Sequence, residues 1–356
     1  MGLELLRPRK RTAADMEIQE EEDTDDLVDV DVVQGSKHGD GSIYQPGAHY
    51  LHRLYKLADT REIFHQLIYG RCSIDPSARL EAMRLSDPTK DCYPCWTSCR
   101  QHAGSAMLQI FSLKLSNLPA TAAGYSRIDL YGFIAFRDLL DPLRNYIFNY
   151  SRDDPYIIQN INSDPFIYLS GPKRGVYLEC RVLMEYDIRI KKGATEQDDL
   201  QLIDGAATFN ELTCFHGVFT NCIRGDHGAT LDISRAIFSG AVEATVEVWV
   251  TKLSEKNESW DDHGLDLSIS GYISKITEEI KLFRGVVKEP CALGRFVVAL
   301  RLDAFLFLHF KVPSCGPSNS KLDWFAFRVV NHGSIIDIRK FHFGTVEVKV
   351  TWSSLV

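Results

Sequence analysis

From about residue 106 onward, apolar and polar residues alternate with the period of two that is typical of half-buried β-strands. Residues 241–253 (AVEATVEVWVTKL) and 345–352 (TVEVKVTW) place apolar side chains at every second position, with polar groups between them. Turn-like sequences such as residues 170–175 (SGPKRG) separate several of these runs. Strands with one polar face favour antiparallel sheets, so the pattern predicts a mainly β fold, an antiparallel β-sandwich or barrel-like module, over residues 106–356.

One alternating run is longer than an ordinary strand. Residues 176–191 (VYLECRVLMEYDIRIK) keep the period of two throughout, with Arg181, Glu185 and Asp187 on the polar face. At about 3.3 Å per residue such a run exceeds the usual strand length, so a bulge or bend is expected within it. The polar face is expected to be solvated.

The N-terminal region has a different composition from the rest of the chain. Residues 7–11 (RPRKR) are basic, residues 17–31 are strongly acidic, and a polar, glycine-containing stretch follows. Such segments bury too little apolar surface to offset the entropy of ordering, which predicts a disordered acidic tail over residues 1–49. Apolar spacings of three and four then predict a short helix early in residues 50–105, followed by an irregular linker that contains cysteines.

The net charge and the cysteine content limit the ligands and the cellular location that are expected for this protein. A net charge of −8 argues against general nucleic-acid binding, which needs a basic surface. The nine cysteines are scattered and odd in number, the first residues lack the apolar core of a signal peptide, and no apolar run reaches the ~18 residues of a membrane helix. A cytoplasmic protein without membrane contact is expected, and the basic run at 7–11 leaves a nuclear location open.

The strongest chemical signal is DCYPCWTSCRQH at residues 91–102. The spacing of Cys92 and Cys95 is typical of half a zinc site, and Cys99 and His102 would complete four sulfur and nitrogen ligands. All four residues would then lie on one short loop, without secondary structure to fix a tetrahedral geometry. The Cys-x-x-Cys pair is also found in redox proteins, although no βαβ pattern surrounds it here. The sequence favours a third interpretation over both, a set of reduced thiols without a ligand, and no cofactor is expected.

The other residues that could bind a ligand or act in catalysis can each also be explained by a purely structural role. Carboxylates in residues 138–154 resemble the acidic loops that bind calcium, but the interleaved arginines favour salt-bridged or turn-capping aspartates. The aspartates are Asp138, Asp141, Asp153 and Asp154, and the arginines are Arg137, Arg144 and Arg152. His309 alternates within a strand run, which is typical of a packed residue. There is no Gly-x-Ser-x-Gly elbow and no phosphate-binding loop, so no catalytic residue is assigned and the sequence favours a protein that is not an enzyme.

Several ordered blocks resemble a plant family found mainly in grasses, known as domain of unknown function 6598. The blocks are residues 128–155, 169–175, 184–193, 198–205, 241–250, 278–283, 295–300 and 348–355. The resemblance implies a β-rich module without an assigned activity. Some relatives are fused to a ribosome-inactivating N-glycosidase domain, including jasmonate-induced proteins of cereals, which implies a stress or defence setting.

These observations favour a non-catalytic interaction module with a protein partner. One alternative is an rRNA N-glycosidase or an accessory domain of one, because residues 81–84 (Glu-Ala-Met-Arg) resemble the Glu-Ala-x-Arg motif of those enzymes. Such a domain needs far more folded residues before the motif than this chain offers. The other alternative is a surface module that binds zinc or calcium.

Overall fold

The computed structural model describes most of the chain from residue 82 onward. Described are residues 30–32, 35, 37–40, 82–95 and 99–355, except 123, 139, 142, 180–181, 210–216, 226, 255–263 and 313–322. The short helix expected early in residues 50–105 and most of the expected tail lie outside this set. Within it, no helix has the length and apolar character needed to cross a membrane.

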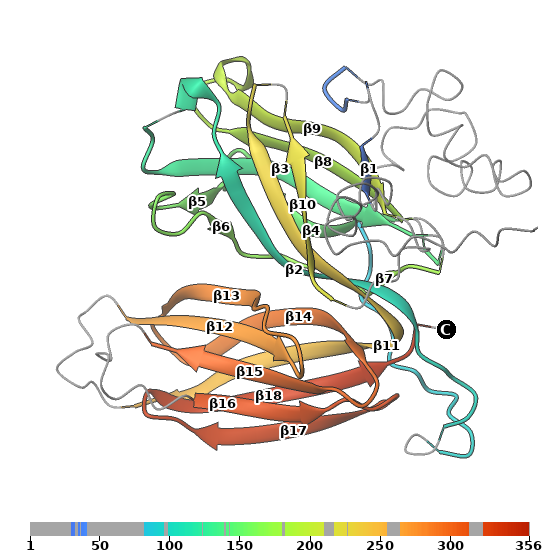
Figure 1. Cartoon of the computed structure of the whole chain (residues 1–356). Coiled ribbons are helices and arrows are strands. Elements are labelled where there is room, and N and C mark those ends of the chain that lie inside the picture. The colour runs from blue at the N-terminus through green and yellow to red at the C-terminus, as the bar shows by residue number, and fades with distance from the viewer. Residues whose placement is uncertain are drawn as a thin grey trace, which may run out of the picture.

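The described residues form antiparallel β-sheets, which confirms the predicted fold class (Figure 1). Two hydrophobic cores divide the strands into an upper and a lower sandwich in the view of Figure 1, called here the first and second sandwich. In one layer of the first sandwich the order is β1 (Val30–Val32), β9 (Leu200–Phe209), β8 (Val182–Ile190), β3 (Ile128–Arg137) and β4 (Asn145–Tyr150), with β5 (Tyr156–Ile158) beside β3. Its other layer contains β10 (Phe219–Arg224), β11 (Thr230–Leu253) and β2 (Ser105–Asn117), with the short strands β6 (Phe166–Ile167) and β7 (Val176–Tyr177) on β2.

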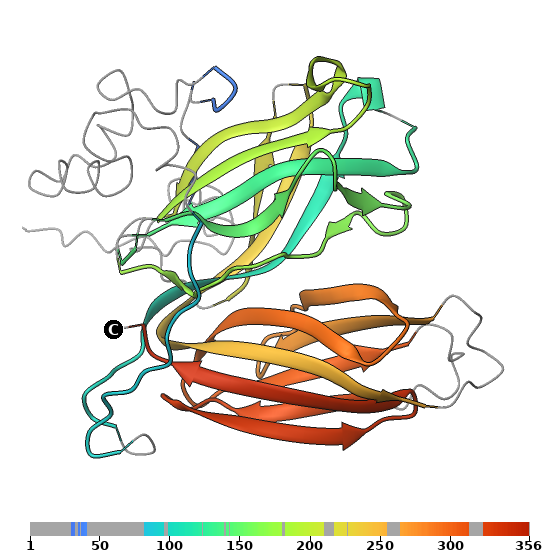
Figure 2. The same cartoon turned by 180° about the vertical axis from the view of Figure 1, so that it is seen from behind.

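The second sandwich also has two layers (Figure 2). One layer contains β17 (Gly333–Lys340), β18 (Gly344–Ser353), the C-terminal half of β11 and β14 (Cys291–Arg301). The other is a four-stranded sheet in the order β13 (Ile280–Val287), β12 (Leu265–Ile273), β15 (Phe305–Lys311) and β16 (Asp323–Arg328). β17 lies at the edge of its sheet in both views.

Strand β11 belongs to both sandwiches. It is 24 residues long, and its first half pairs with β10 and β2 while its second half pairs with β14 and β18. Leu231 and Ile233 lie in the first core, whereas Val246 and Val248 lie in the second. The consecutive residues Ile237 and Phe238 belong to different cores, so both faces of the strand are covered near its middle.

The middle of β11 also makes a close approach to the chain that enters β2. Gly240 has a φ of +60°, in the left-handed region that favours glycine. A Cβ atom at Gly104 would lie 2.4 Å from the carbonyl carbon of Gly240, so no larger residue fits at that position. Two glycines therefore allow the chain to cross β11 at the junction of the sandwiches.

The long alternating run at residues 176–191 is interrupted as expected. It forms β7, which pairs with β2, and then β8, which pairs with β3 and β9 in the opposite layer. Val182, Met184 and Tyr186 are buried in the first core. Glu185 differs from the expectation of a solvated face, because it is fully buried.

A short described part of the N-terminal region pairs with the first sandwich. Residues Val30 to Val32 form β1, which pairs with Phe209, Thr208 and Ala207 of β9. A strand at the edge of a sheet presents unpaired backbone groups, and a short extended segment is sufficient to satisfy them.

Residues 82–104 form an extended segment, called here the strap, that contains no helix and no named strand in its described part. Met83 donates a backbone hydrogen bond to the Arg144 carbonyl in the first sandwich at 2.8 Å. Further along, the Thr89 hydroxyl lies 2.8 Å from the Ser353 hydroxyl at the end of β18. The strap therefore runs from the first sandwich to the second, close to the C-terminus (Figure 2).

Because β2 and β11 contribute to both cores, we expect the two sandwiches to unfold together. Phe111 of β2 is fully buried in the second core, so Phe111→Ala should lower the free energy of unfolding by about 3–5 kcal/mol. Urea unfolding followed by circular dichroism should show one transition, shifted as a whole. The control Phe305→Ala, at a ring that is 42% exposed, should cost about 1 kcal/mol or less. Two separate transitions, only one of which shifts, would contradict this view.

Candidate metal centre

The strap folds back on itself around the predicted cysteine cluster. The backbone N–H of Arg100 donates to the carbonyl of Tyr93 at 2.8 Å, and this bond closes a loop. Cys92 and Cys99 stand at the two ends of the loop and are half-buried, whereas Cys95 is exposed within it.

Four side chains converge at the ends of this loop. The ligand atoms of Cys92, Cys99, His102 and His332 all lie within 4.8 Å of one another. The Nδ1 atom of His102 is 3.4 Å from the Cys99 sulfur, and the rings of His102 and His332 meet edge to face with centroids 5.1 Å apart. His332 belongs to the turn between β16 and β17, so the group joins the strap to the second sandwich.

The structure brings together three of the four residues predicted from the sequence. Cys95 is not part of the group, and His332 occupies the fourth position. Cys95 lies within the closed loop, and its side chain is exposed. His332 is too far along the chain for any spacing rule to find, and its only signal is a histidine in the turn sequence NHGS between two strand runs.

His332 is the most deeply buried member of the group. It is 0% exposed, and neither ring nitrogen has a hydrogen-bond partner among the described residues. A neutral imidazole carries one N–H donor and one acceptor, and leaving such groups unsatisfied in the interior costs roughly 1–3 kcal/mol. A buried imidazole beside two thiols therefore has the chemistry of a metal ligand.

The two thiols of the group differ in acidity. Burial raises the pKa of Cys99, but hydrogen bonds from His102 and from backbone N–H groups outweigh it and hold the pKa at about 6. Burial and the hydrogen bond to Cys99 both raise the pKa of Cys92. Cys99 is therefore the thiolate of the pair at neutral pH, and the thiolate is the form that binds metals.

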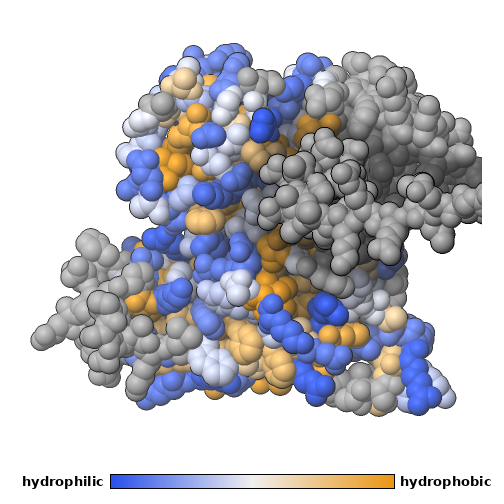
Figure 3. All heavy atoms as spheres, viewed as in Figure 1, coloured by the Kyte–Doolittle hydropathy of each residue, from blue (hydrophilic) through white to orange (hydrophobic). Residues whose placement is uncertain are grey.

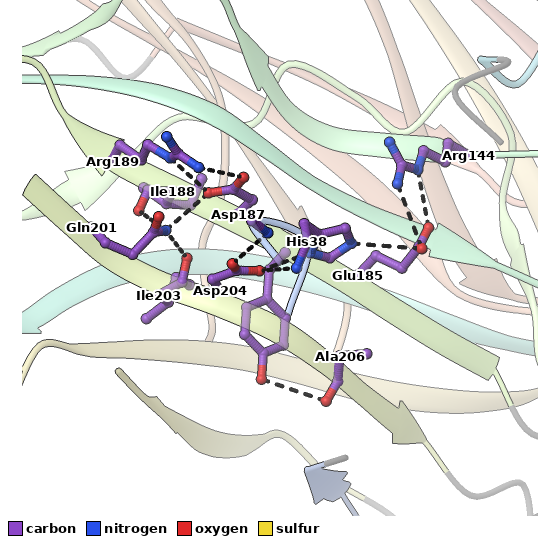
Figure 4. Close-up of polar contacts among 12 residues, drawn as sticks. His38, Arg144, Glu185, Asp187, Ile188, Arg189, Gln201, Ile203, Asp204 and Ala206 are labelled. Carbon is purple, nitrogen blue, oxygen red and sulfur yellow. Dashed lines mark hydrogen bonds and ion pairs between the residues drawn. The ribbon is translucent and has the colours of Figure 1, made fainter. Parts of the chain in front are cut away.

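A separate cluster of charges is buried in the first sandwich, around Glu185 (Figure 4). The Glu185 carboxylate accepts hydrogen bonds from Nε of Arg137 at 2.7 Å and from Nε of Arg144 at 3.0 Å. The Arg144 guanidinium also lies 4.2 Å from the centre of the Phe133 ring. Burial raises the pKa of Glu185, but the two arginines outweigh it and hold the pKa well below its usual range.

His38 attaches the N-terminal region to this cluster (Figure 4). Its Nδ1 lies 2.9 Å from Asp204, its Nε2 lies 3.6 Å from Glu185, and its backbone N–H donates to Asp204 at 2.7 Å. The side chain is only 6% exposed. These contacts and a backbone hydrogen bond from Gly39 to Asp204 hold His38 and Gly39 against the sheet.

The aspartates considered as calcium ligands have other roles. Asp138 forms a buried ion pair with Arg174 and accepts backbone hydrogen bonds from Leu140 and Tyr177. The interleaved arginines pair elsewhere, Arg137 and Arg144 with Glu185 and Arg152 with Asp199. For Asp138 the salt-bridged, turn-capping interpretation is confirmed. Among the described residues, no group with metal-binding geometry includes Asp138, Asp141, Asp153 or Asp154.

The remaining candidate residues that the structure describes, or their neighbours, are packed against other side chains. His309 packs against Tyr272 with ring centroids 4.6 Å apart, on a half-buried face of β15, as expected for a packed residue. Glu81 of the Glu-Ala-x-Arg sequence lies outside the described residues. Its neighbour Met83 is a core residue that is 6% exposed.

We expect the contribution of His38 to stability to depend on pH. Burial lowers the pKa of His38, but bonds to Asp204 and Glu185 outweigh it and raise the pKa above 6.5. A raised pKa in the folded state means that the contribution is complete below pH 6.5 and is lost as pH rises through the folded-state pKa. The difference in free energy of unfolding between wild type and His38→Ala should therefore shrink as pH increases, measured by urea unfolding at a series of pH values. A difference that grows with pH would contradict the docked, charged imidazole.

The fold and the site together define a class: an antiparallel double β-sandwich with a Cys₂His₂ group between its strap and its second sandwich. Residues 107–350 match the family described as Domain of unknown function (DUF6598), and the chain belongs to this family. The resemblance that the sequence blocks carried is thereby confirmed. Cys92, Cys99 and His102 precede the matched region, whereas His332 lies within it.

The search of curated proteins finds no match to this chain. Among solved structures, human GIVD cytosolic phospholipase A2 aligns with 71% of this chain and 33% of its own, at 8% identity and a TM-score of 0.22. The two calcium-bound C2 domains of Extended-Synaptotagmin 2 align with 71% of this chain and 98% of theirs, at 9% identity and a TM-score of 0.24. The chain thus spans one third of the phospholipase, and likenesses this weak carry no argument about function.

Proposed function

We propose that this protein is a zinc-binding β-sandwich module in which one zinc ion, held by Cys92, Cys99, His102 and His332, fastens the strap to the second sandwich. The observation that carries the proposal is the convergence of four ligand atoms within 4.8 Å from two parts of the chain that are distant in sequence. Two sulfur and two nitrogen donors in a compact group match the ligands of structural zinc sites.

The dimensions of the group support zinc. Tetrahedral zinc with Zn–S bonds of about 2.3 Å and Zn–N bonds of about 2.0–2.1 Å separates its ligand atoms by roughly 3.3–3.8 Å. The 3.4 Å between the Cys99 sulfur and Nδ1 of His102 is already in this range. The other atoms need to approach by at most about 1.5 Å, which rotation of thiol and imidazole side chains provides. Thiolate and imidazole donors together favour zinc over calcium or magnesium, which prefer oxygen.

A zinc ion with four protein ligands is a structural centre. Catalytic zinc keeps one coordination position for water or substrate, and here protein side chains fill all four. The closed donor set supports a role in binding, in line with the non-catalytic interaction module favoured by the sequence. We infer that the partner is a protein in a plant stress or defence setting. Zinc binds the reduced thiolate form of cysteine, which persists in the reducing cytoplasm, and this supports a cytoplasmic location.

The proposal predicts one zinc ion per chain. Inductively coupled plasma mass spectrometry of wild type purified without chelators should find about one equivalent of zinc, because all four ligands are present. Cys92→Ser, Cys99→Ser and His332→Ala should each lose most of the metal and melt at a lower temperature. Cys95→Ser is the matched control, since it makes the same change in the same loop outside the four-residue group, and it should keep the metal.

Two results would overturn the assignment. One is wild-type protein without zinc in which Cys92 and Cys99 are found as free thiols or as a disulfide. The other is zinc loss in Cys95→Ser with zinc retained in His332→Ala, which would restore the ligand set predicted from the sequence.

A further inference from the structure

The edge strand β17 carries three isoleucine side chains that are about half exposed to solvent. Ile335, Ile336 and Ile338 are 49%, 57% and 58% exposed. Figure 3 shows that hydrophobic and hydrophilic residues alternate over much of the second sandwich, so an isolated exposed residue there has no special meaning. Three isoleucines within four positions of one edge strand are a different case, because such an edge is a template for pairing with another chain.

The register with β18 fixes the direction of these side chains. Ile336 and Ile338 lie opposite Lys349 and Glu347, on the outer face of the sheet. Asp337 and Arg339 lie opposite the buried residues Val348 and Val346, on the inner face at the rim of the core, and form an ion pair with each other at 2.9 Å. The Arg339 guanidinium also donates a hydrogen bond to the backbone carbonyl of Trp324 at 2.8 Å. Ile335 lies opposite Val350, on the same inner face. Among the described strands, β18 is the only one that pairs with β17, so no described strand occupies the other edge of β17.

We propose that the open edge of β17 pairs antiparallel with β17 of a second copy of this protein, about a two-fold axis at Ile338. In that register Asp337 lies directly opposite the Arg339 position of the other copy, and the reverse holds at the symmetric site. The two Ile338 side chains meet at the axis, and each Ile336 packs on the aliphatic stem of the other copy's Lys340 position. Opposite charges directly across a strand pair stabilise it, and like charges weaken it.

Charge distinguishes this register from the registers in which the two-fold axis lies at a neighbouring residue. An axis at Asp337 would bring two aspartates directly opposite each other, and an axis at Ile336 would leave Asp337 opposite an isoleucine. Only the axis at Ile338 places Asp337 and Arg339 of each copy opposite the oppositely charged residue of the other copy. Two cross-strand pairs are thereby added to the ion pair that Asp337 and Arg339 already form within each strand. Such an isologous contact closes on itself and gives a dimer rather than a fibre.

The dimer is independent of the metal proposal. β17 begins at Gly333, directly after His332, but neither Ile338 nor the charged pair is a ligand of the four-residue group. A variant can therefore lose dimerisation and keep zinc, and the failure of one proposal is distinguishable from the failure of the other.

Sedimentation velocity of the full chain over a wide range of concentrations tests the proposal. Wild type should show a monomer–dimer equilibrium, and Ile338→Asp should raise the dimer Kd by at least about tenfold, because two desolvated carboxylates would meet at the axis. Zinc content and melting temperature should stay close to those of wild type. The control Val286→Asp makes the same kind of change at a residue that is 56% exposed on β13 and should leave the Kd unchanged.

A charge-reversal pair tests the register. Asp337→Arg alone and Arg339→Asp alone should each dimerise about tenfold or more weakly than wild type, because each places like charges opposite each other. Mixing the two variants should restore association, since positions 337 and 339 then carry opposite charges across the axis. A wild-type protein that is monomeric throughout, an Ile338→Asp variant that associates normally, or a mixture without restored association would each overturn the proposal.

Discussion

Both sandwiches depend on one strand, β11, whose side chains are divided between two hydrophobic cores. Its C-terminal half contributes Val242, Val246 and Val250, which are at most 1% exposed, and its N-terminal half contributes Ile233 to the other core. Each fully buried aliphatic side chain of this kind stabilises the fold by roughly 1.5–3 kcal/mol relative to its exposed state. Since β2 also contributes to both cores, the two sandwiches share a rigid central layer, and their relative placement follows from strand pairing.

The proposed metal centre would stabilise the strap within this arrangement. The described part of the strap crosses from one sandwich to the other without a strand partner, held by isolated hydrogen bonds such as those of Met83 and Thr89. Its entropy of ordering is therefore offset by few contacts. A metal ion that joins His102 to His332 closes a long loop of chain, which is where a cross-link constrains the unfolded state most. The rigid central layer places the β16–β17 turn where the strap can reach it.

Strand periodicity was sufficient to predict the antiparallel fold and the inward valines of residues 241–253, because a period of two follows directly from backbone geometry. The periodicity failed at polar residues that were expected to face solvent but are buried and hydrogen-bonded. Glu185 is satisfied by Arg137 and Arg144, and Glu243 accepts a hydrogen bond from the backbone N–H of Gly175 at 2.6 Å. These contacts depend on how the sheets stack on one another, and the local sequence pattern does not specify that stacking. The same limit applies to the candidate metal group: local spacing found Cys92, Cys99 and His102, but only the fold brings His332 close to them, and Cys95 is not part of the group.

Zinc K-edge X-ray absorption of the purified full-length protein tests the central claim most directly, because it reports the atoms bound to the metal. We predict a coordination shell of two sulfur atoms at about 2.3 Å and two nitrogen atoms at about 2.0 Å, with the multiple-scattering features of two imidazoles. A shell with three sulfur atoms would show that Cys95 binds in place of His332. A shell of oxygen and nitrogen alone would show that the cysteines are not ligands, and either result would contradict the proposed centre.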